Sequence, residues 1–164
     1  MENKLLVWKT AIVTFFTALG AALGWKGVML LVWVGVMLLD YISGTFAACK
    51  SGEWSSAKAR EGLWHKAGMI IVILVAGIAD IVMEVACTNL NLGIAYTGLV
   101  LPLVLAWYII TELGSVLENA VKLGVKIPAW LTNMLKISLK AVDKVGEGQP
   151  EQEEDKEPDA ESGA

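Results

Sequence analysis

Long uncharged runs separated by short charged segments dominate this chain. The longest, Val85–Thr111, holds 27 residues without Asp, Glu, Lys or Arg, and shorter ones cover residues 10–25, 27–39 and 67–79. A helix needs about 20 mainly apolar residues to cross a bilayer. The longest run meets this length alone, and the others meet it when single charges are included. The pattern therefore predicts an all-α, polytopic membrane protein.

We predict four transmembrane helices within a membrane domain of residues 1–126, over residues 5–25, 27–49, 65–87 and 92–118. The first is the least secure because Lys9 lies inside it, so three spans are the alternative. Tryptophans near most predicted ends match the aromatic belts of membrane proteins. A signal peptide over the same N-terminal residues is a rival. However, the apolar pattern resumes directly after Lys26, where a polar mature chain would be expected.

The pattern changes twice after residue 126. In residues 127–145, apolar positions alternate with Lys136, Lys140 and Lys144, whose four-residue spacing puts them on one helix face. We interpret this segment as a short basic amphipathic helix on the inner leaflet, with an ordinary solvated helix as the alternative. Residues 146–164 are rich in Glu, Gly, Pro and Ser, a composition that predicts a disordered acidic tail.

Composition supports the membrane interpretation. The chain is 55% hydrophobic and only 18% charged, with mean hydropathy +0.58. Its net charge of −4 is unevenly distributed. Residues 147–164 carry eight acidic side chains and one lysine, a net charge of −7, which leaves +3 on residues 1–146. Such a body has too little polar surface to cover a soluble core. It is also too apolar for a disordered chain.

Few residues are available for catalysis or metal binding. The chain has one histidine, His65, in a basic loop, and two cysteines, Cys49 and Cys87, at opposite helix ends. We expect the cysteines to be packing residues without a disulfide between them. No HExxH, GxSxG, P-loop or CxxC motif is present. The sequence therefore predicts no enzyme, no metal site and no cofactor.

Basic residues indicate the orientation in the membrane. Four of them lie in the predicted 50–66 loop and five in residues 122–144, whereas the predicted 88–91 loop has none. The positive-inside rule then places the 50–66 loop and the C-terminus in the cytoplasm. Four spans would put the N-terminus there too, and three would put it outside.

Polar groups inside the apolar helices are the main functional candidates, because a mid-membrane carboxylate costs roughly 3 kcal/mol. No lysine or arginine is expected at matching depth, except Lys9 and Lys26. We therefore expect protonation, a water-lined face, or Asn and Ser partners. The candidates in or near the spans are Asp40, Ser43, Gly44, Asp80, Glu84, Glu112, Ser115 and Asn119.

Two spacings suggest helix contacts. Tyr108, Glu112, Ser115, Asn119 and Lys122 follow one another at intervals of 4, 3, 4 and 3, which places them on one seam of a helix. This seam is either a polar packing surface or a face that becomes wet when subunits assemble. Close helix packing is also suggested by a GxxxG element, formed by Gly20 and Gly24.

Several motifs resemble those of phage lysis and toxin-secretion holins. Asp40, Ser43 and Gly44 resemble the family's Asp-x-x-Thr/Ser-Gly element, and Asp80 matches an aspartate in the following helix. Ser55-Ser56 and the Gly62-to-Lys66 spacing resemble its Ser-Ser and Gly-x-x-x-Lys stretch, although a second lysine is usual where Trp64-His65 stand. Residues 107–128 resemble Tyr-Ile-x-x-Glu-x-x-Ser-Ile-x-Glu-Asn followed by Leu-Gly-x-x-Ile-Pro.

The resemblance covers about residues 30–135 and implies a holin. Holins accumulate in the host cytoplasmic membrane and then form timed lesions that release an endolysin or, beside toxin genes, a toxin. The expected direct partners are the lipid bilayer and further copies of the chain, with no nucleic acid. The endolysin is an indirect partner and an antiholin a further candidate. Alternative initiation does not supply one, because the next methionine is Met29. The acidic tail departs from the basic tails common in holins.

Two other functions are open from the residues alone. A small proton-coupled transporter would also use membrane carboxylates, but these are scattered over three predicted helices and no inverted repeat is visible. A membrane adaptor without pore activity would bind a partner through its cytoplasmic tail. Abrupt loss of membrane potential on expression is expected only of a holin.

Overall fold

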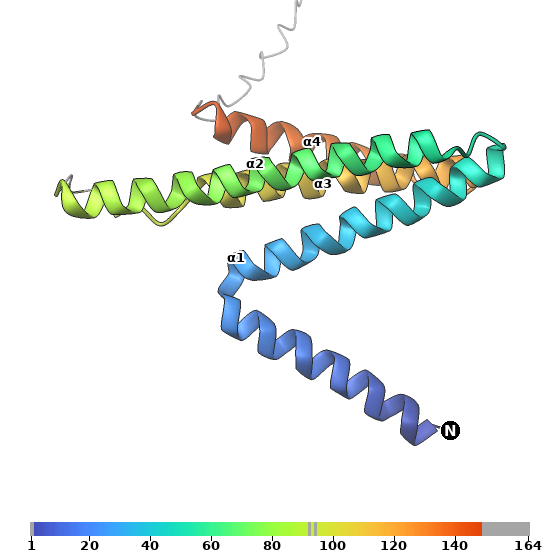
Figure 1. Ribbon diagram of the computed structural model, residues 1–164, viewed down its shortest axis with the longest axis horizontal. Coiled ribbons are helices and arrows are strands. Elements are labelled where there is room, and N and C mark those ends of the chain that lie inside the picture. The colour runs from blue at the N-terminus through green and yellow to red at the C-terminus, as the bar shows by residue number, and fades with distance from the viewer. Residues whose placement is uncertain (1, 92, 94, 149–164) are drawn as a thin grey trace, which may run out of the picture.

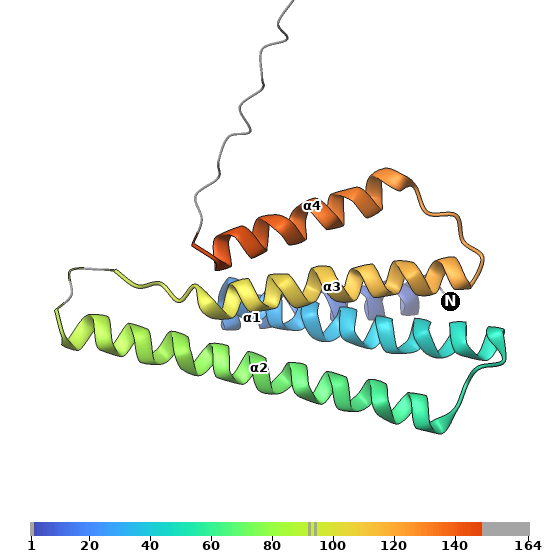
Figure 2. The ribbon, with the colours of Figure 1, turned by 90° about the horizontal axis from the view of Figure 1, so that it is seen from above.

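The computed structural model describes the backbone of residues 2–91, 93 and 95–148, with side chains mainly from Gly24 onward. This described part contains four α-helices and no strand, which confirms the predicted all-α class. Figures 1 and 2 show them as long rods. The helices are α1 (Glu2–Ser51), α2 (Ser56–Asn89), α3 (Val100–Lys122) and α4 (Ala129–Gly146). The predicted disordered tail lies outside the described residues from 149 onward.

A kink at Gly24 divides α1 into two halves. Gly24 has φ 65° and ψ −176°, a conformation that glycine adopts without the steric cost of a Cβ. The break lies just before the predicted one at residues 25–27. Figure 1 shows the N-terminal half of α1 directed away from the other helices. Gly20 and Gly24 therefore do not lie on one regular helix face, and packing of a second helix on them stays a prediction.

Three helical segments of the described chain are long and apolar enough to cross a membrane. They are Gly24–Ser51, Ser56–Asn89 and Val100–Lys122. These segments correspond to the second, third and fourth predicted spans. The first predicted span, residues 5–25, is not among them and stays a prediction.

Two predicted helix boundaries are wrong. Residues 56–64, predicted as loop, form the start of α2, because the Ser55 side chain caps this helix by accepting a hydrogen bond from the Lys58 N–H. At the other end, α3 begins at Val100 rather than residue 92. Gly93 and Gly98 both have positive φ values between α2 and α3, so this connection is not helical there.

Helix α3 is the centre of the assembly. It packs against α1, α2 and α4, whereas α1 and α2 scarcely contact each other. Figure 2 shows α3 between α2 and α4. A small apolar core joins Trp33 of α1, Met69 and Ile73 of α2, and Leu105 of α3. Most other apolar side chains of α2, including Ile71, are exposed, as expected for a surface that faces lipid.

The predicted C-terminal helix is present as α4. Its half-buried residues Leu131, Leu135, Leu139 and Val142 recur at intervals of four, four and three. Near its end, the Trp107 indole N–H of α3 donates a hydrogen bond of 2.9 Å to the Asp143 carboxylate. Helix α4 therefore folds back along α3, antiparallel to it (Figure 2).

Candidate functional site

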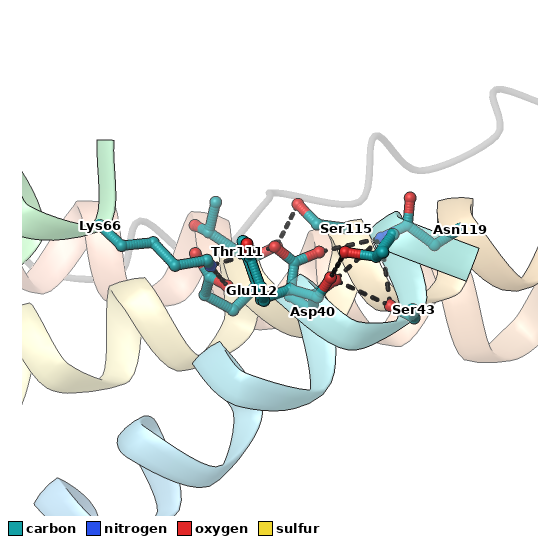
Figure 3. Close-up of polar contacts among 9 residues, drawn as sticks. Asp40, Ser43, Lys66, Thr111, Glu112, Ser115 and Asn119 are labelled. Atoms are coloured by element: carbon teal, nitrogen blue, oxygen red, sulfur yellow. Dashed lines mark hydrogen bonds and ion pairs between the residues drawn. The ribbon is translucent and has the colours of Figure 1, made fainter. Parts of the chain in front are cut away.

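An ion triad joins the three candidate spans. The Lys66 ammonium of α2 donates to Asp40 Oδ2 of α1 at 3.0 Å and to Glu112 Oε2 of α3 at 2.6 Å. Figure 3 shows the lysine reaching toward both carboxylates. The Glu112 side chain is 6% exposed, that of Lys66 11% and that of Asp40 19%. The triad is thus largely shielded, and it links α2 to both other candidate spans.

A neutral hydrogen-bond network extends the triad on the side of α1 and α3. The Asn119 amide donates to Asp40 Oδ1 at 3.0 Å and to Ser43 Oγ at 3.2 Å (Figure 3). Ser43 in turn donates to the Asp40 carbonyl oxygen at 3.0 Å. A Cβ on Gly44 would lie 3.4 Å from the Asn119 amide nitrogen, so the helices meet closely here. The Asp40, Ser43 and Gly44 motif therefore forms one half of an α1–α3 contact.

With both carboxylates ionised, the triad carries a surplus negative charge, because one ammonium faces two carboxylates. Breaking a buried ion pair by removing one partner costs about 3–5 kcal/mol, since the other charge is left unpaired. Asp40 is partly compensated by the Asn119 amide. Glu112, the most shielded member, has Lys66 as its only side-chain hydrogen-bond donor in the described part of the chain. Lys66 therefore decides whether both carboxylates can stay ionised in a dry environment.

Clefts approach the triad from two sides. One cleft of about 180 Å³ is lined by residues of α1 and α2 and reaches Asp40 and Lys66. Another, of about 620 Å³, is lined mainly by α2 and α3 and reaches Lys66 and Glu112. Asp40 and Lys66 line both clefts, so the two clefts meet at the triad.

The structure overturns one sequence-based expectation about these carboxylates. Lys66 lies at the depth of Asp40 and Glu112, where no cation was expected. The prediction was wrong because it started this span at residue 65, so that Lys66 lay at its end, whereas the helix in fact begins nine residues earlier, at Ser56. The Ser-Ser pair at residues 55–56 was the available signal, because serine is a preferred N-cap.

Asp80 belongs to a second cluster at the opposite end of α3. Its carboxylate accepts hydrogen bonds from the Val100 and Leu101 N–H groups at 2.9 and 3.1 Å, and from the Tyr96 hydroxyl at 2.6 Å. It thus caps the positive N-terminus of α3 from a neighbouring helix. At 1.5 Å per residue, Leu101 and Glu112 lie roughly 16 Å apart along α3, so Asp80 does not share the triad's site.

The Asp80 cluster also fixes the loop before α3. Lys26, just after the kink of α1, donates to the Thr97 carbonyl oxygen at 2.8 Å. The hydrogen bond to the Asp80 carboxylate raises the pKa of the Tyr96 hydroxyl, because ionised tyrosine could not donate it. Gly98, with φ 73°, lies so close to Lys26 that a Cβ would collide with its ammonium, and this Cβ would lie 3.1 Å from Asp80 Oδ2. This cluster is therefore a structural joint between α1, α2 and α3.

The remaining candidates are not brought into either cluster. Glu84 is exposed, and its carboxylate makes no hydrogen bond within the described residues. Ser115 donates to the Thr111 carbonyl oxygen of its own helix at 3.4 Å. Of the predicted α3 seam, Glu112 and Asn119 are buried in the network, whereas Lys122 is exposed.

The two cysteines differ in burial. Cys87 is buried, as expected of a packing residue, but Cys49 is exposed, so its predicted packing role is wrong within this chain. Both are free thiols. Among the described residues, no group of three or more His, Cys, Asp or Glu side chains is arranged to hold a metal ion.

Comparison with known proteins finds uncharacterised relatives and one matching family model. An uncharacterised 14.9 kDa protein of the nagH 3′ region of Clostridium perfringens is 32% identical over 136 residues, covering 83% of this chain and 96% of the relative. An uncharacterised protein of Listeria innocua is 28% identical over 132 residues, or 80% and 86% of the two chains. No solved structure is significantly similar. The model of the bacteriophage holin family matches residues 17–140, so this chain, with its three membrane-span-like helices, belongs to the bacteriophage holin family.

Proposed function

We propose that this protein oligomerises in the cytoplasmic membrane of a phage host and opens timed lesions that release an endolysin. The observation that carries the proposal is the Asp40–Lys66–Glu112 triad, which holds three ionised groups inside three helices able to span a membrane. Ionised groups in such helices are costly and usually line a water pathway or pair with one another. Here they pair within one chain, which gives the closed state a defined structure.

The triad suggests how one chain has two stable arrangements. In the closed state, Lys66 holds both carboxylates and little charge faces lipid. In the open state, α2 moves away from α3 and the three charges are hydrated at the wall of a lesion. Hydration replaces the lost ion pairs, so the two states can differ by only a few kcal/mol, and a rising density of protein in the membrane can shift their populations.

Other copies of this chain are the partners that the open state requires, because one chain with three spans cannot enclose an aqueous path. The exposed apolar surfaces of α2 and of the part of α1 after Gly24 leave room for such contacts. The same lesion would serve a toxin as well as an endolysin, and an antiholin would act by joining the oligomer in its closed state.

The charge distribution supports a cytoplasmic C-terminus. Basic residues concentrate at residues 50–66 and 122–144, whereas the connection after α2 carries none between residues 85 and 111. With three spans, the N-terminus is then outside. A fourth span over residues 5–25, as the sequence predicts, would place it inside.

Inducible expression in a bacterial host tests the proposal. We expect normal growth while the protein accumulates, followed by abrupt loss of membrane potential and viability. The exposed Lys58→Gln variant, which removes only a surface ion pair with Glu53, serves as a matched control and should keep this behaviour. A gradual, pH-gradient-dependent flux without loss of viability would indicate a transporter. Accumulation with no change in permeability would indicate an adaptor.

A further inference from the structure

Helix α4 has an apolar stripe that no other part of the described chain covers. Its inner side packs on α3 through leucines, but its outer side also exposes large apolar groups. Trp130 is 62% exposed, Met134 56%, Ile137 67% and Val145 53%. Intervals of four, three and eight residues place them on one side of the helix, with Ala141 between the last two.

Three lysines flank this apolar stripe. Lys136, Lys140 and Lys144 are all exposed and recur every four residues along one edge of α4. The helix has one acidic residue, Asp143, and the Trp107 indole already bonds it. The outward surface of α4 is therefore both apolar and cationic, a combination that fits the interface of an anionic lipid bilayer.

The observed position of α4 conflicts with a bilayer around α3. Because α4 runs antiparallel to α3 and Asp143 contacts Trp107, Lys140 lies level with the middle of α3, near Thr111. A lysine at this depth disfavours insertion about 100-fold on insertion scales. Three such lysines beside a spanning helix are far more costly than the apolar contacts of one helix side.

The contact between α3 and α4 is also incomplete. A groove of about 470 Å³ remains between them, lined by Gly114, Glu118, Thr132 and Lys136 among others. The end of α3 is anchored separately, because Lys50 of α1 donates to the Leu123 carbonyl oxygen at 2.6 Å. Between this anchor and Pro128, the connection is largely exposed and begins at Gly124, with φ 93°. Release of α4 about this connection would therefore break the Trp107–Asp143 hydrogen bond and the leucine contacts, but would leave the Lys50 anchor of α3 in place.

We infer that α4 is a docking helix for the anionic surface of the membrane leaflet, which it reaches by leaving α3. The three lysines contact phospholipid headgroups while the apolar stripe enters the interface. The move uncovers the small and polar α3 face around Gly114 and Glu118. The inference rests on the proposed membrane insertion of α3, but not on lesion formation.

Full-length protein in vesicles tests this docking. A fluorophore on Met134→Cys, in a Cys49→Ser and Cys87→Ala background, reports the depth of α4 through quenching by lipids brominated near the headgroup or at the chain ends. We expect quenching near the headgroup in vesicles containing phosphatidylglycerol. This quenching should weaken at high salt and in phosphatidylcholine alone. Each lysine contributes about fivefold to binding an anionic surface, so the Lys136→Gln, Lys140→Gln, Lys144→Gln variant should bind about 100-fold less.

A matched variant removes the same charge elsewhere. Lys58→Gln, Arg60→Gln and Lys126→Gln alter exposed residues outside α4 and should leave the headgroup quenching unchanged. Quenching only by chain-end bromines would overturn the inference, because α4 would then remain beside α3. Absence of quenching by either lipid would also overturn it. If truncation after Gly146 then restored headgroup quenching, the acidic tail would be what covers the apolar stripe of α4. If quenching stayed absent, a second copy of the chain would be what covers it.

This result is separable from the proposed function. Vesicle docking needs no host, endolysin or lesion. Headgroup quenching together with unchanged host viability on expression would support the docking surface and contradict the holin activity. Lysis without headgroup quenching would support the holin activity and contradict the docking surface.

Discussion

Lys66 Nζ lies 2.6 Å from Glu112 Oε2, and this contact joins two helices that are each able to span a membrane. The same nitrogen lies 3.0 Å from Asp40 Oδ2 of a third helix. One cation therefore neutralises part of a two-carboxylate site in which every member is largely shielded. The stability of the three-helix assembly should depend on the balance of these charges more than on any single contact.

The first prediction concerns the charge count of the triad. Lys66→Gln leaves two carboxylates with no cation and should lower the free energy of unfolding by about 3–5 kcal/mol. Glu112→Gln leaves one intact ion pair and should cost less. The triple variant Asp40→Asn, Lys66→Met, Glu112→Gln carries no charge at the site and should recover much of the loss. Thermal unfolding in a mild detergent measures the order of stability of these three variants. Equal losses for Lys66→Gln and the triple variant would contradict it.

A second prediction concerns the close approach of α1 and α3 at Gly44. A Cβ there would contact the Asn119 amide at 3.4 Å, an ordinary distance, so Gly44→Ala should be tolerated within about 1 kcal/mol. Gly44→Leu should separate the helices and break the Asn119–Asp40 bond, at a cost of about 2–3 kcal/mol. Gly35→Leu on the same helix is the control, because a Cβ there meets no atom within 4 Å. Similar unfolding temperatures for the two leucine variants would argue against a tight α1–α3 contact.

The sequence predicts the helices well because their signal is local. Uncharged runs, the predicted break at residues 25–27 and the lysine spacing of residues 136–144 depend only on neighbouring residues, and each has a matching feature in the structure. The boundaries of α2 and α3 were missed for equally local reasons. The serine cap at Ser55 and the positive φ values of Gly93 and Gly98 outweighed the hydropathy pattern.

The site is only partly predictable because its partners come from separate helices. The insertion cost of a carboxylate marks Asp40, Asp80 and Glu112 in the sequence. It does not show that Lys66 reaches two of them, since that depends on where α2 starts and how it lies against α3. Nor does it show that Asp80 caps α3 rather than joining the triad.

A third prediction separates the effect of backbone strain from that of side-chain collision at the Asp80 cluster. Gly93→Ala adds a Cβ at φ 68° in open space, so it should cost only the conformational penalty of about 1–2 kcal/mol. Gly98→Ala, at φ 73°, also forces the Lys26 ammonium away from the Thr97 carbonyl oxygen and crowds Asp80, so it should cost clearly more. Thermal unfolding of the two alanine variants gives the comparison. Equal destabilisation would mean that Lys26 relaxes freely and does not tie α1 to the joint.

A fourth prediction concerns orientation. Ser56 is exposed at the start of α2, beside the basic residues that the positive-inside rule places in the cytoplasm. In a background without Cys49 and Cys87, Ser56→Cys should resist a membrane-impermeant thiol reagent in intact cells before lysis. It should react once the membrane is permeabilised, which controls for burial. Rapid labelling of intact cells would reverse the proposed topology.

The last prediction concerns timing, and the triad supplies its sign. The closed state holds one carboxylate in excess of its cation, whereas in the open state water hydrates every charge. Glu112→Gln removes the excess negative charge, which is costly in the closed state but not in the hydrated open state. The substitution should therefore favour the closed state and delay or abolish lysis. Asp40→Asn should act in the same direction but more weakly, because the Asn119 amide already compensates Asp40. Lys66→Gln should do the opposite and advance lysis. The measurement is lysis time at matched amounts of protein in the membrane, and wild-type timing in all three variants would leave the triad as a packing element without control over assembly.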